Sequence, residues 1–215
     1  MKDSSFNSII KKILDLLFPP TDETKQLRKL SNKDLVKLPT HRIPEKSFIE
    51  AVCDYRYEKV RDVVYALKFS ESKLAAEIIG ELLQEEILAI CQEHRIFADK
   101  IVITPIPLSA NRKRERGFNQ SKRVCEAIAD NDNENIFVHK QLLEKTRQTA
   151  DQTELSKSER CKNVRGVFRT TKKINDEATI YVIDDVTTTG ATLAEARRAL
   201  REVTDAKIIG IAFAH

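Results

Sequence analysis

Residues 180–192 join two adjacent carboxylates to a run of hydroxyl side chains. The segment reads Ile-Tyr-Val-Ile-Asp-Asp-Val-Thr-Thr-Thr-Gly-Ala-Thr, so an apolar stretch ends in Asp184 and Asp185. In open α/β sheets, ligands bind at the carboxyl ends of strands. Backbone N–H groups and the positive end of a following helix bind phosphate, and Gly190 lets the backbone approach the anion. Because the two acids would repel phosphate, they suit the hydroxyls of an attached sugar, with a divalent cation nearby.

A purely structural interpretation of this segment is also possible. In that case Thr187–Thr189 cap the helix, and Asp184 and Asp185 are solvated in a turn. An isolated Asp-Asp or Thr-Thr pair would favour the structural interpretation. The complete arrangement favours a binding site for a phosphorylated sugar.

The elements that must position these residues alternate along the chain. Strands are predicted at 100–107, 136–138, 179–184 and 207–213, and amphipathic helices at 71–92, 118–130 and 190–202. This alternation predicts an α/β domain with a doubly wound, mainly parallel sheet flanked by helices. Residues 144–165 carry many charges and little periodicity, which predicts a loop.

Two regions are expected, an N-terminal helical appendage with a linker over 1–48 and the α/β domain over 49–215. Apolar side chains recur at helical spacing in 5–18 and stop at two prolines, and 19–48 is polar and holds four of the six prolines. A total of 215 residues suits one domain with such an appendage.

Composition excludes several classes of protein. With 41% hydrophobic residues and no apolar run near the roughly 20 residues of a spanning helix, neither a disordered chain nor membrane insertion is expected. The net charge of +4 is small, so an argument for nucleic acid must rest on where the charges lie. No secretory pattern begins the sequence, which predicts a cytoplasmic protein. The cysteines, which we interpret as buried small hydrophobic residues, are Cys53, Cys91, Cys125 and Cys161.

Several blocks of the sequence resemble the ComF family of competence proteins, whose fold is that of type I phosphoribosyltransferases. The 180–192 segment resembles the signature with which those enzymes bind 5-phosphoribosyl-1-pyrophosphate (PRPP). The other ComF-like blocks are Tyr57–Arg61 with Leu67–Phe69, Pro105–Leu108 with Arg114–Gln120, and Arg147–Phe168. Together they span about residues 55–213, and the Arg-Gly-Phe-Asn-Gln block combined with the signature is specific.

The resemblance implies a role for each block. Asp184 and Asp185 would hold the ribose hydroxyls. The 5-phosphate would be bound by Val186, Thr187, Thr188, Thr189, Gly190, Ala191 and Thr192. Pyrophosphate would be bound by Pro105, Ile106, Pro107, Leu108, Arg114 and Arg116. A mobile loop would contribute Arg147, Gln148, Gln152 and Arg160, and Mg²⁺ would be held mainly through PRPP and water.

Some of these residues also have simpler interpretations. The prolines of Pro105–Leu108 would end a strand in any fold, and the six basic residues of 111–123 would suit a solvated face. Beside a diphosphate, the same charges would neutralise the leaving group or follow a nucleic-acid backbone. Lys68 is either a lysine extending from an apolar segment or part of the site.

The sequence departs from the family near its N-terminus. ComF-like proteins commonly carry a four-cysteine zinc module after a Leu-Leu-Phe-Pro-Pro-like stretch. This chain keeps Leu16–Pro20, but Thr21–Thr24 follows without a cysteine. His41 alone cannot build a tetrahedral site, so no zinc is expected.

The resemblance implies a PRPP-binding protein that displaces pyrophosphate with an unidentified acceptor and is linked to natural transformation, the uptake of DNA. In this fold a hood selects the acceptor, and here the hood is expected within 19–60. The alternative is a non-catalytic competence protein that binds single-stranded DNA and recombination or helicase partners through basic residues at 111–123 and 160–173. An aromatic content of 6% without tryptophan makes base-stacking platforms scarce.

Overall fold

The computed structural model describes residues 41–42, 48–69, 72–93, 100–130, 136–147 and 164–215. The predicted helix at 5–18 lies outside the described residues, as do Gln148, Gln152 and Arg160. The strands are β1 (His41–Arg42), β2 (Ile49–Cys53), β3 (Ile101–Pro105), β4 (Ile136–Val138), β5 (Leu143–Lys145), β6 (Phe168–Thr170), β7 (Thr179–Val186) and β8 (Lys207–Ala214). The helices are α4 (Glu58–Phe69), α5 (Lys73–Glu93), α6 (Ala110–Arg116), α7 (Gln120–Asp130) and α9 (Ala191–Arg201).

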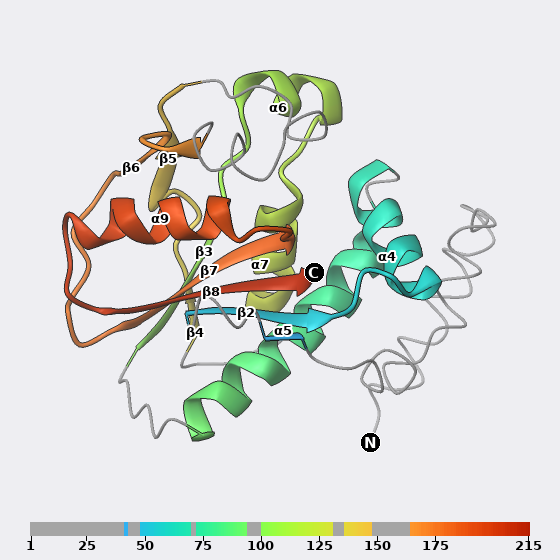
Figure 1. Cartoon of the computed structure of the whole chain (residues 1–215), viewed down its shortest axis with the longest axis horizontal. Helices are drawn as coiled ribbons and strands as arrows, with labels where there is room; N and C mark the ends of the chain where they lie inside the picture. The colour runs from blue at the N-terminus through green and yellow to red at the C-terminus, as the bar shows by residue number, and fades with distance from the viewer. Residues whose placement is uncertain (1–40, 43–47, 70–71, 94–99, 131–135, 148–163) are drawn as a thin grey trace, which may run out of the picture.

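The main sheet has the strand order β1-β2-β8-β7-β3-β4 (Figure 1). The five strands from β2 to β4 are parallel, and β1 pairs antiparallel with β2. Helices connect β2 to β3, β3 to β4 and β7 to β8 and cover both faces, so the doubly wound α/β prediction is confirmed. The architecture is consistent with the type I phosphoribosyltransferase fold.

Strand β7 lies in the middle of the sheet, which explains its continuous apolar sequence. Tyr181 and Ile183 pack into the core beneath α5 and α7, whereas Ile180 and Val182 pack into the core beneath α9. All four side chains are fully buried. The strand is therefore held on both faces, and the carboxylates at its end have a rigid base.

Three features differ from the sequence-based expectations. β2 lies within the main sheet, although residues 19–60 were expected to form a hood. β5 pairs antiparallel with β6, so Glu144 and Lys145 are strand residues and the predicted loop at 144–165 begins too early. α4 and α6 were not predicted. All of these elements except α4 are short, with seven residues or fewer, and short elements show little periodicity.

Three cysteines lie among the described residues. Cys53 and Cys125 are buried, Cys91 is partly buried, and all three are free thiols. Burial raises the pKa of Cys53 to about 12 and also raises the pKa of Cys125. The interpretation as buried hydrophobic residues is confirmed for Cys53 and Cys125, and Cys161 lies outside the described residues.

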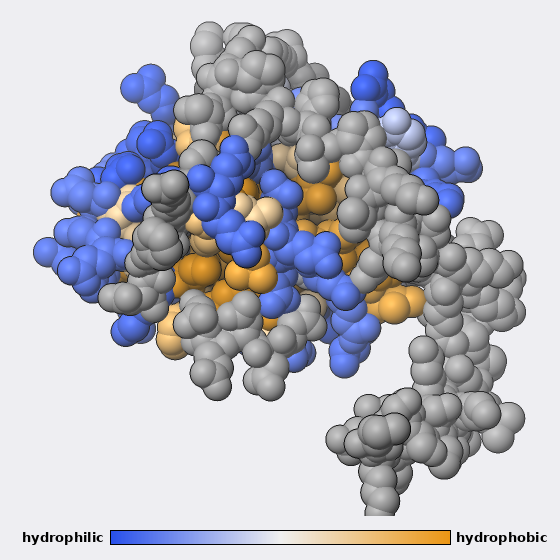
Figure 2. All heavy atoms as spheres, turned by 90° about the horizontal axis from the view of Figure 1, so that it is seen from below, coloured by the Kyte–Doolittle hydropathy of each residue, from blue (hydrophilic) through white to orange (hydrophobic). Residues whose placement is uncertain are grey.

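Figure 2 shows one face of the molecule, on which hydrophobic side chains form patches between hydrophilic ones. Large hydrophobic side chains are exposed at Tyr55, Tyr57, Tyr65, Phe69, Leu88 and Phe137. Within the described ranges, the helices are all too short or too polar to cross a bilayer.

Candidate functional site

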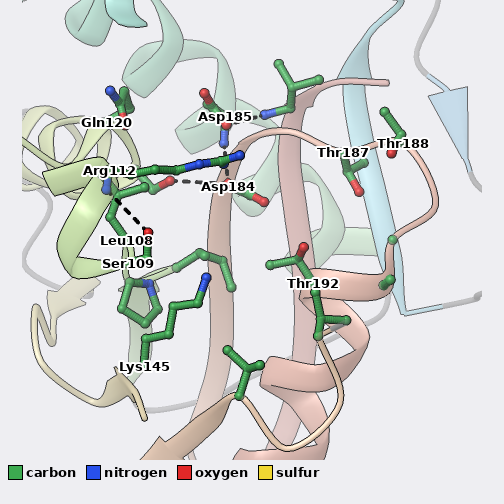
Figure 3. Close-up of a pocket in the computed structure, with 18 of the residues that line it drawn as sticks. Leu108, Ser109, Arg112, Gln120, Lys145, Asp184, Asp185, Thr187, Thr188 and Thr192 are labelled. Atoms are coloured by element: carbon green, nitrogen blue, oxygen red, sulfur yellow. Dashed lines mark hydrogen bonds between the residues drawn. The ribbon is translucent and has the colours of Figure 1, made fainter. Parts of the chain in front are cut away.

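A cavity of about 390 Å³ lies at the carboxyl ends of β3 and β7. Its walls come from the segment after β7, the segment after β3, the first residues of α7 and the end of α4 (Figure 3). This is the edge of the sheet where open α/β folds bind ligands. The cavity therefore lies where the sequence predicted a site.

The paired acids lie at the centre of this cavity. Asp184 Oδ1 accepts hydrogen bonds from the backbone N–H of Asp185 at 3.0 Å and from the Ser121 hydroxyl at 3.3 Å. Asp185 Oδ1 accepts from the backbone N–H of Val186 at 2.8 Å, and its Oδ2 lies 3.1 Å from the ammonium of Lys68. Lys68 is therefore part of the site, on the last turn of α4.

Asp184 is held in an environment that disfavours its charge. Burial, followed by the neighbouring charge of Asp185, raises its pKa to about 8. The backbone N–H of Asp185 and the ammonium of Lys68 oppose this effect only in part. The pair can therefore present one ionised and one protonated carboxyl to a ligand, which suits hydroxyl groups that both donate and accept hydrogen bonds.

The loop after Asp185 runs along the cavity to the start of α9. All seven predicted residues, Val186 to Thr192, line the cavity. Gly190 has φ 67°, in the left-handed region, and α9 begins at the next residue, so glycine is needed there. The backbone N–H of Thr187 donates to Ala214 of β8, which fixes the start of the loop. Ala191 and Thr192, the first residues of α9, line the cavity, so the N-terminal end of this helix lies at the cavity.

The segment after β3 forms the opposite wall. Ile106, Pro107 and Leu108 line the cavity, and the side-chain amide of Asn119 donates to the carbonyl of Ile106 at 2.9 Å. Pro105 is the last residue of β3 and does not line the cavity.

Of the two predicted arginines on α6, one lines the cavity and the other does not. Arg116 lines the cavity, together with Arg112. Arg114 is exposed, does not line the cavity and donates to Asn111 at 2.6 Å. Arg147 also lies outside the cavity wall, where it donates to the carbonyl of Arg165 at 2.7 Å.

Lys145 is a site residue that the sequence did not single out. It lines the cavity from β5, and its pKa is lowered to about 8 by burial, then by the charges of Arg112 and Arg147, with Asp184 acting in the opposite sense. Strand β5, which positions Lys145, has three residues and no periodic pattern, so nothing in the sequence indicated that Lys145 belongs to the site. Figure 3 shows Asp184 and Asp185 between the threonines on one side and Arg112 with Lys145 on the other.

Tyr55 and His215 are two further wall residues that the sequence analysis left without a role. They follow β2 and β8, so the rule that ligands bind at strand carboxyl ends would have found them. The backbone N–H of Tyr55 donates to the carbonyl of His215 at 2.9 Å, and the N–H of His215 donates to Cys53 at 3.1 Å. His215 Nδ1 lies 3.2 Å from the carbonyl oxygen of Thr187.

The chain is similar to known proteins over most of the α/β domain. It is 34% identical over 139 residues to the DNA utilization protein YhgH of Salmonella typhi, which covers 64% of this chain and 59% of the relative. With YhgH of Escherichia coli K12 the identity is 31% over 154 residues, 69% of this chain and 63% of the relative. With the competence protein ComFC of Bacillus subtilis it is 36% over 109 residues, 50% and 42% of the two chains. The chain belongs to the ComF family.

Membership of the ComF family confirms the resemblance that the sequence blocks indicated. No family model matches the chain. This ComF protein spans about three fifths of the length of its YhgH relatives.

Proposed function

We infer that this ComF-family protein binds PRPP and displaces pyrophosphate from its C1 with an acceptor nucleophile, as part of DNA handling in the cytoplasm. One observation carries the inference. A single cavity contains, in order, the threonine loop at the start of α9, a carboxylate pair and a cationic wall. PRPP has the matching order of 5-phosphate, ribose hydroxyls and diphosphate.

Each part of PRPP would then meet suitable groups. The 5-phosphate would bind the backbone N–H groups of the threonine loop, and the ribose hydroxyls would bind Asp184 and Asp185. The diphosphate would lie near the segment after β3, where Arg112, Arg116 and Lys145 offset the negative charge that develops as it leaves. Catalysis of this kind consists mostly of positioning and electrostatic stabilisation.

Mg²⁺ fits this arrangement when PRPP itself supplies most of the ligands. The described residues contain no group of three or more His, Cys, Asp or Glu that would hold a metal ion, and Asp185 is already paired with Lys68. Mg²⁺ prefers phosphate, hydroxyl and water oxygens and takes few protein ligands. The ion would supply positive charge at the diphosphate.

Calorimetric titration with PRPP and Mg²⁺ tests the proposal. Asp185→Asn removes a charged acceptor of a ribose hydroxyl, a bond of about 1.5–3 kcal/mol, so PRPP affinity should fall roughly 10- to 150-fold. Asp62→Asn, an exposed position on α4, is the matched control and should bind as the wild type does. Unchanged affinity in Asp185→Asn would reject the assigned role, and no binding by the wild type would reject the function.

A second candidate function, binding of single-stranded DNA without turnover, is favoured by a second cavity of about 800 Å³. It shares Pro107, Leu108 and Lys145 with the first cavity, so the two are contiguous. Its other basic wall residues are Lys113, Lys122, Arg123, Lys140 and Lys172. The relatives named for DNA utilization and competence make such a ligand reasonable, together with recombination or helicase partners.

Salt dependence tests this second candidate. Binding of labelled single-stranded DNA should weaken steeply with salt, and Lys113→Glu with Lys172→Glu should reduce the slope of log K against log salt by about 1.4. An unchanged slope would exclude this cavity as the backbone site. Pyrophosphate release by the wild type would favour the enzyme over a binder without turnover.

A further inference from the structure

The cavity has a third wall that neither phosphate end of PRPP uses. Strand order places β8 and β2 on one side of β7, and β3 on the other. Tyr55 and His215, at the ends of β2 and β8, therefore line the side of the cavity away from the segment after β3. Backbone hydrogen bonds between these two strand ends hold both residues in place.

The stereochemistry of the displacement indicates that the nucleophile approaches from the side of this wall. In a displacement with inversion, the nucleophile enters C1 on the face opposite the leaving group. The cations that suit the leaving diphosphate, Arg112 and Lys145, come from α6 and β5 beside the segment after β3. The nucleophile must then enter from the side of β8 and β2, where His215 lies.

The hydrogen bonding of His215 fixes which ring nitrogen carries a proton. Nδ1 lies 3.2 Å from the carbonyl oxygen of Thr187, and a carbonyl only accepts, so Nδ1 must donate. In the neutral ring, Nε2 then has the lone pair. We propose that His215 is the general base of the transfer reaction and that the wall formed by Tyr55 and His215 is the acceptor subsite.

This assignment rests on the proposed function and provides an acceptor for the proton that the nucleophile loses in the transfer. A nucleophile with an N–H or O–H group forms a bond to C1, and the C1–O bond to the diphosphate breaks with its electron pair. The proton of the nucleophile moves to Nε2, while Nδ1–H keeps its bond to Thr187. The acceptor class is therefore a neutral nucleophile with a transferable proton, rather than one already ionised.

Other titratable wall groups serve this role less well. Asp185 is paired with Lys68 at 3.1 Å, and Asp184 is partly buried and bonded to Ser121. Lys145 lies at the leaving-group side. Of the described wall residues, His215 is therefore the base best placed for the entering nucleophile.

The test uses the full chain with PRPP and Mg²⁺, and with water or ammonia as the probe nucleophile. Calorimetry measures PRPP binding, and a coupled assay measures pyrophosphate release. The variants are His215→Gln and His215→Ala. His139→Gln is a matched histidine control, because His139 does not line this cavity.

We expect His215→Gln to bind PRPP as the wild type does and to release pyrophosphate about 10²–10⁴-fold more slowly. Added imidazole should restore release in His215→Ala, which a purely structural role of the ring would not allow. Wild-type release by His215→Gln would overturn the assignment. So would loss of PRPP affinity in that variant, because the ring would then only support Thr187. If the wild type binds PRPP but releases no pyrophosphate with either probe, the base is refuted while the PRPP site stands, whereas absent PRPP binding refutes the proposed function itself.

Discussion

Replacing Asp184 by asparagine removes a carboxylate whose charge the fold opposes, so we expect a protein that is more stable but binds PRPP less well. Burial and Asp185 raise the pKa of Asp184 from 3.8 to about 8. Between about pH 4 and pH 8 the folded state keeps a proton that the unfolded state has released. The free energy of unfolding therefore falls as pH rises through this window, and asparagine abolishes that loss.

The magnitude follows from the size of the shift. At 1.36 kcal/mol for each pKa unit, the shift costs about 5 kcal/mol at pH 8.5. Asparagine keeps an oxygen for the hydroxyl of Ser121 but adds an N–H group that needs an acceptor, which costs about 1–3 kcal/mol. The net gain is about 2–4 kcal/mol, or roughly 4–16 °C in Tm for a chain of this length.

Thermal unfolding at pH 5 and pH 8.5 measures the effect. The Tm of Asp184→Asn should exceed that of the wild type at pH 8.5. The difference in Tm should nearly vanish at pH 5, where burying the Asp184 charge costs the wild type less free energy. Asp62→Asn, at an exposed position, should match the wild type at both pH values. A gain of the same size at both pH values, or a loss at pH 8.5, would refute the reasoning from burial and like-charge repulsion.

Two further predictions concern the two ends of the cavity. Lys145 has a lowered pKa of about 8, so affinity for pyrophosphate should fall above pH 8 as its charge is lost, and calorimetry should find this fall absent in Lys145→Met. An affinity that declines equally in both proteins would assign the titration to another group. Gly190→Ala places a side chain at φ 67°, which should cost about 1–2 kcal/mol in unfolding free energy and weaken PRPP binding. A variant with wild-type Tm and wild-type affinity would show that the loop does not need this conformation.

The sequence predicted the central part of the site because that part is contiguous. In 180–192 a buried strand, two acids, a left-handed glycine and a helix start follow one another, and each leaves a local pattern. Lys145 reaches the same cavity through the pairing of β5 with β6, which leaves no mark on neighbouring residues, whereas His215 follows the predicted last strand and could have been found by the strand-end rule. Arg114 shows the reverse case, since it belongs to a family motif yet is exposed on a short helix and does not line the cavity.

The contacts in the cavity that lower the free energy of unfolding also suit a ligand that carries both hydroxyl and diphosphate groups. Burial, and then the like charges grouped at each position, shift both pKa values toward neutrality, since Asp185 lies beside Asp184 and both Arg112 and Arg147 lie near Lys145. Such grouping costs folding free energy and is typical of functional sites. A ligand with hydroxyls in its middle and a diphosphate at one end would reduce the free-energy cost of both groupings. Its hydroxyls would bond to the acids, and its diphosphate would offset the cations. Ligand binding should therefore stabilise the wild type more than it stabilises Asp184→Asn, since the variant no longer has the repulsion between the two carboxylates.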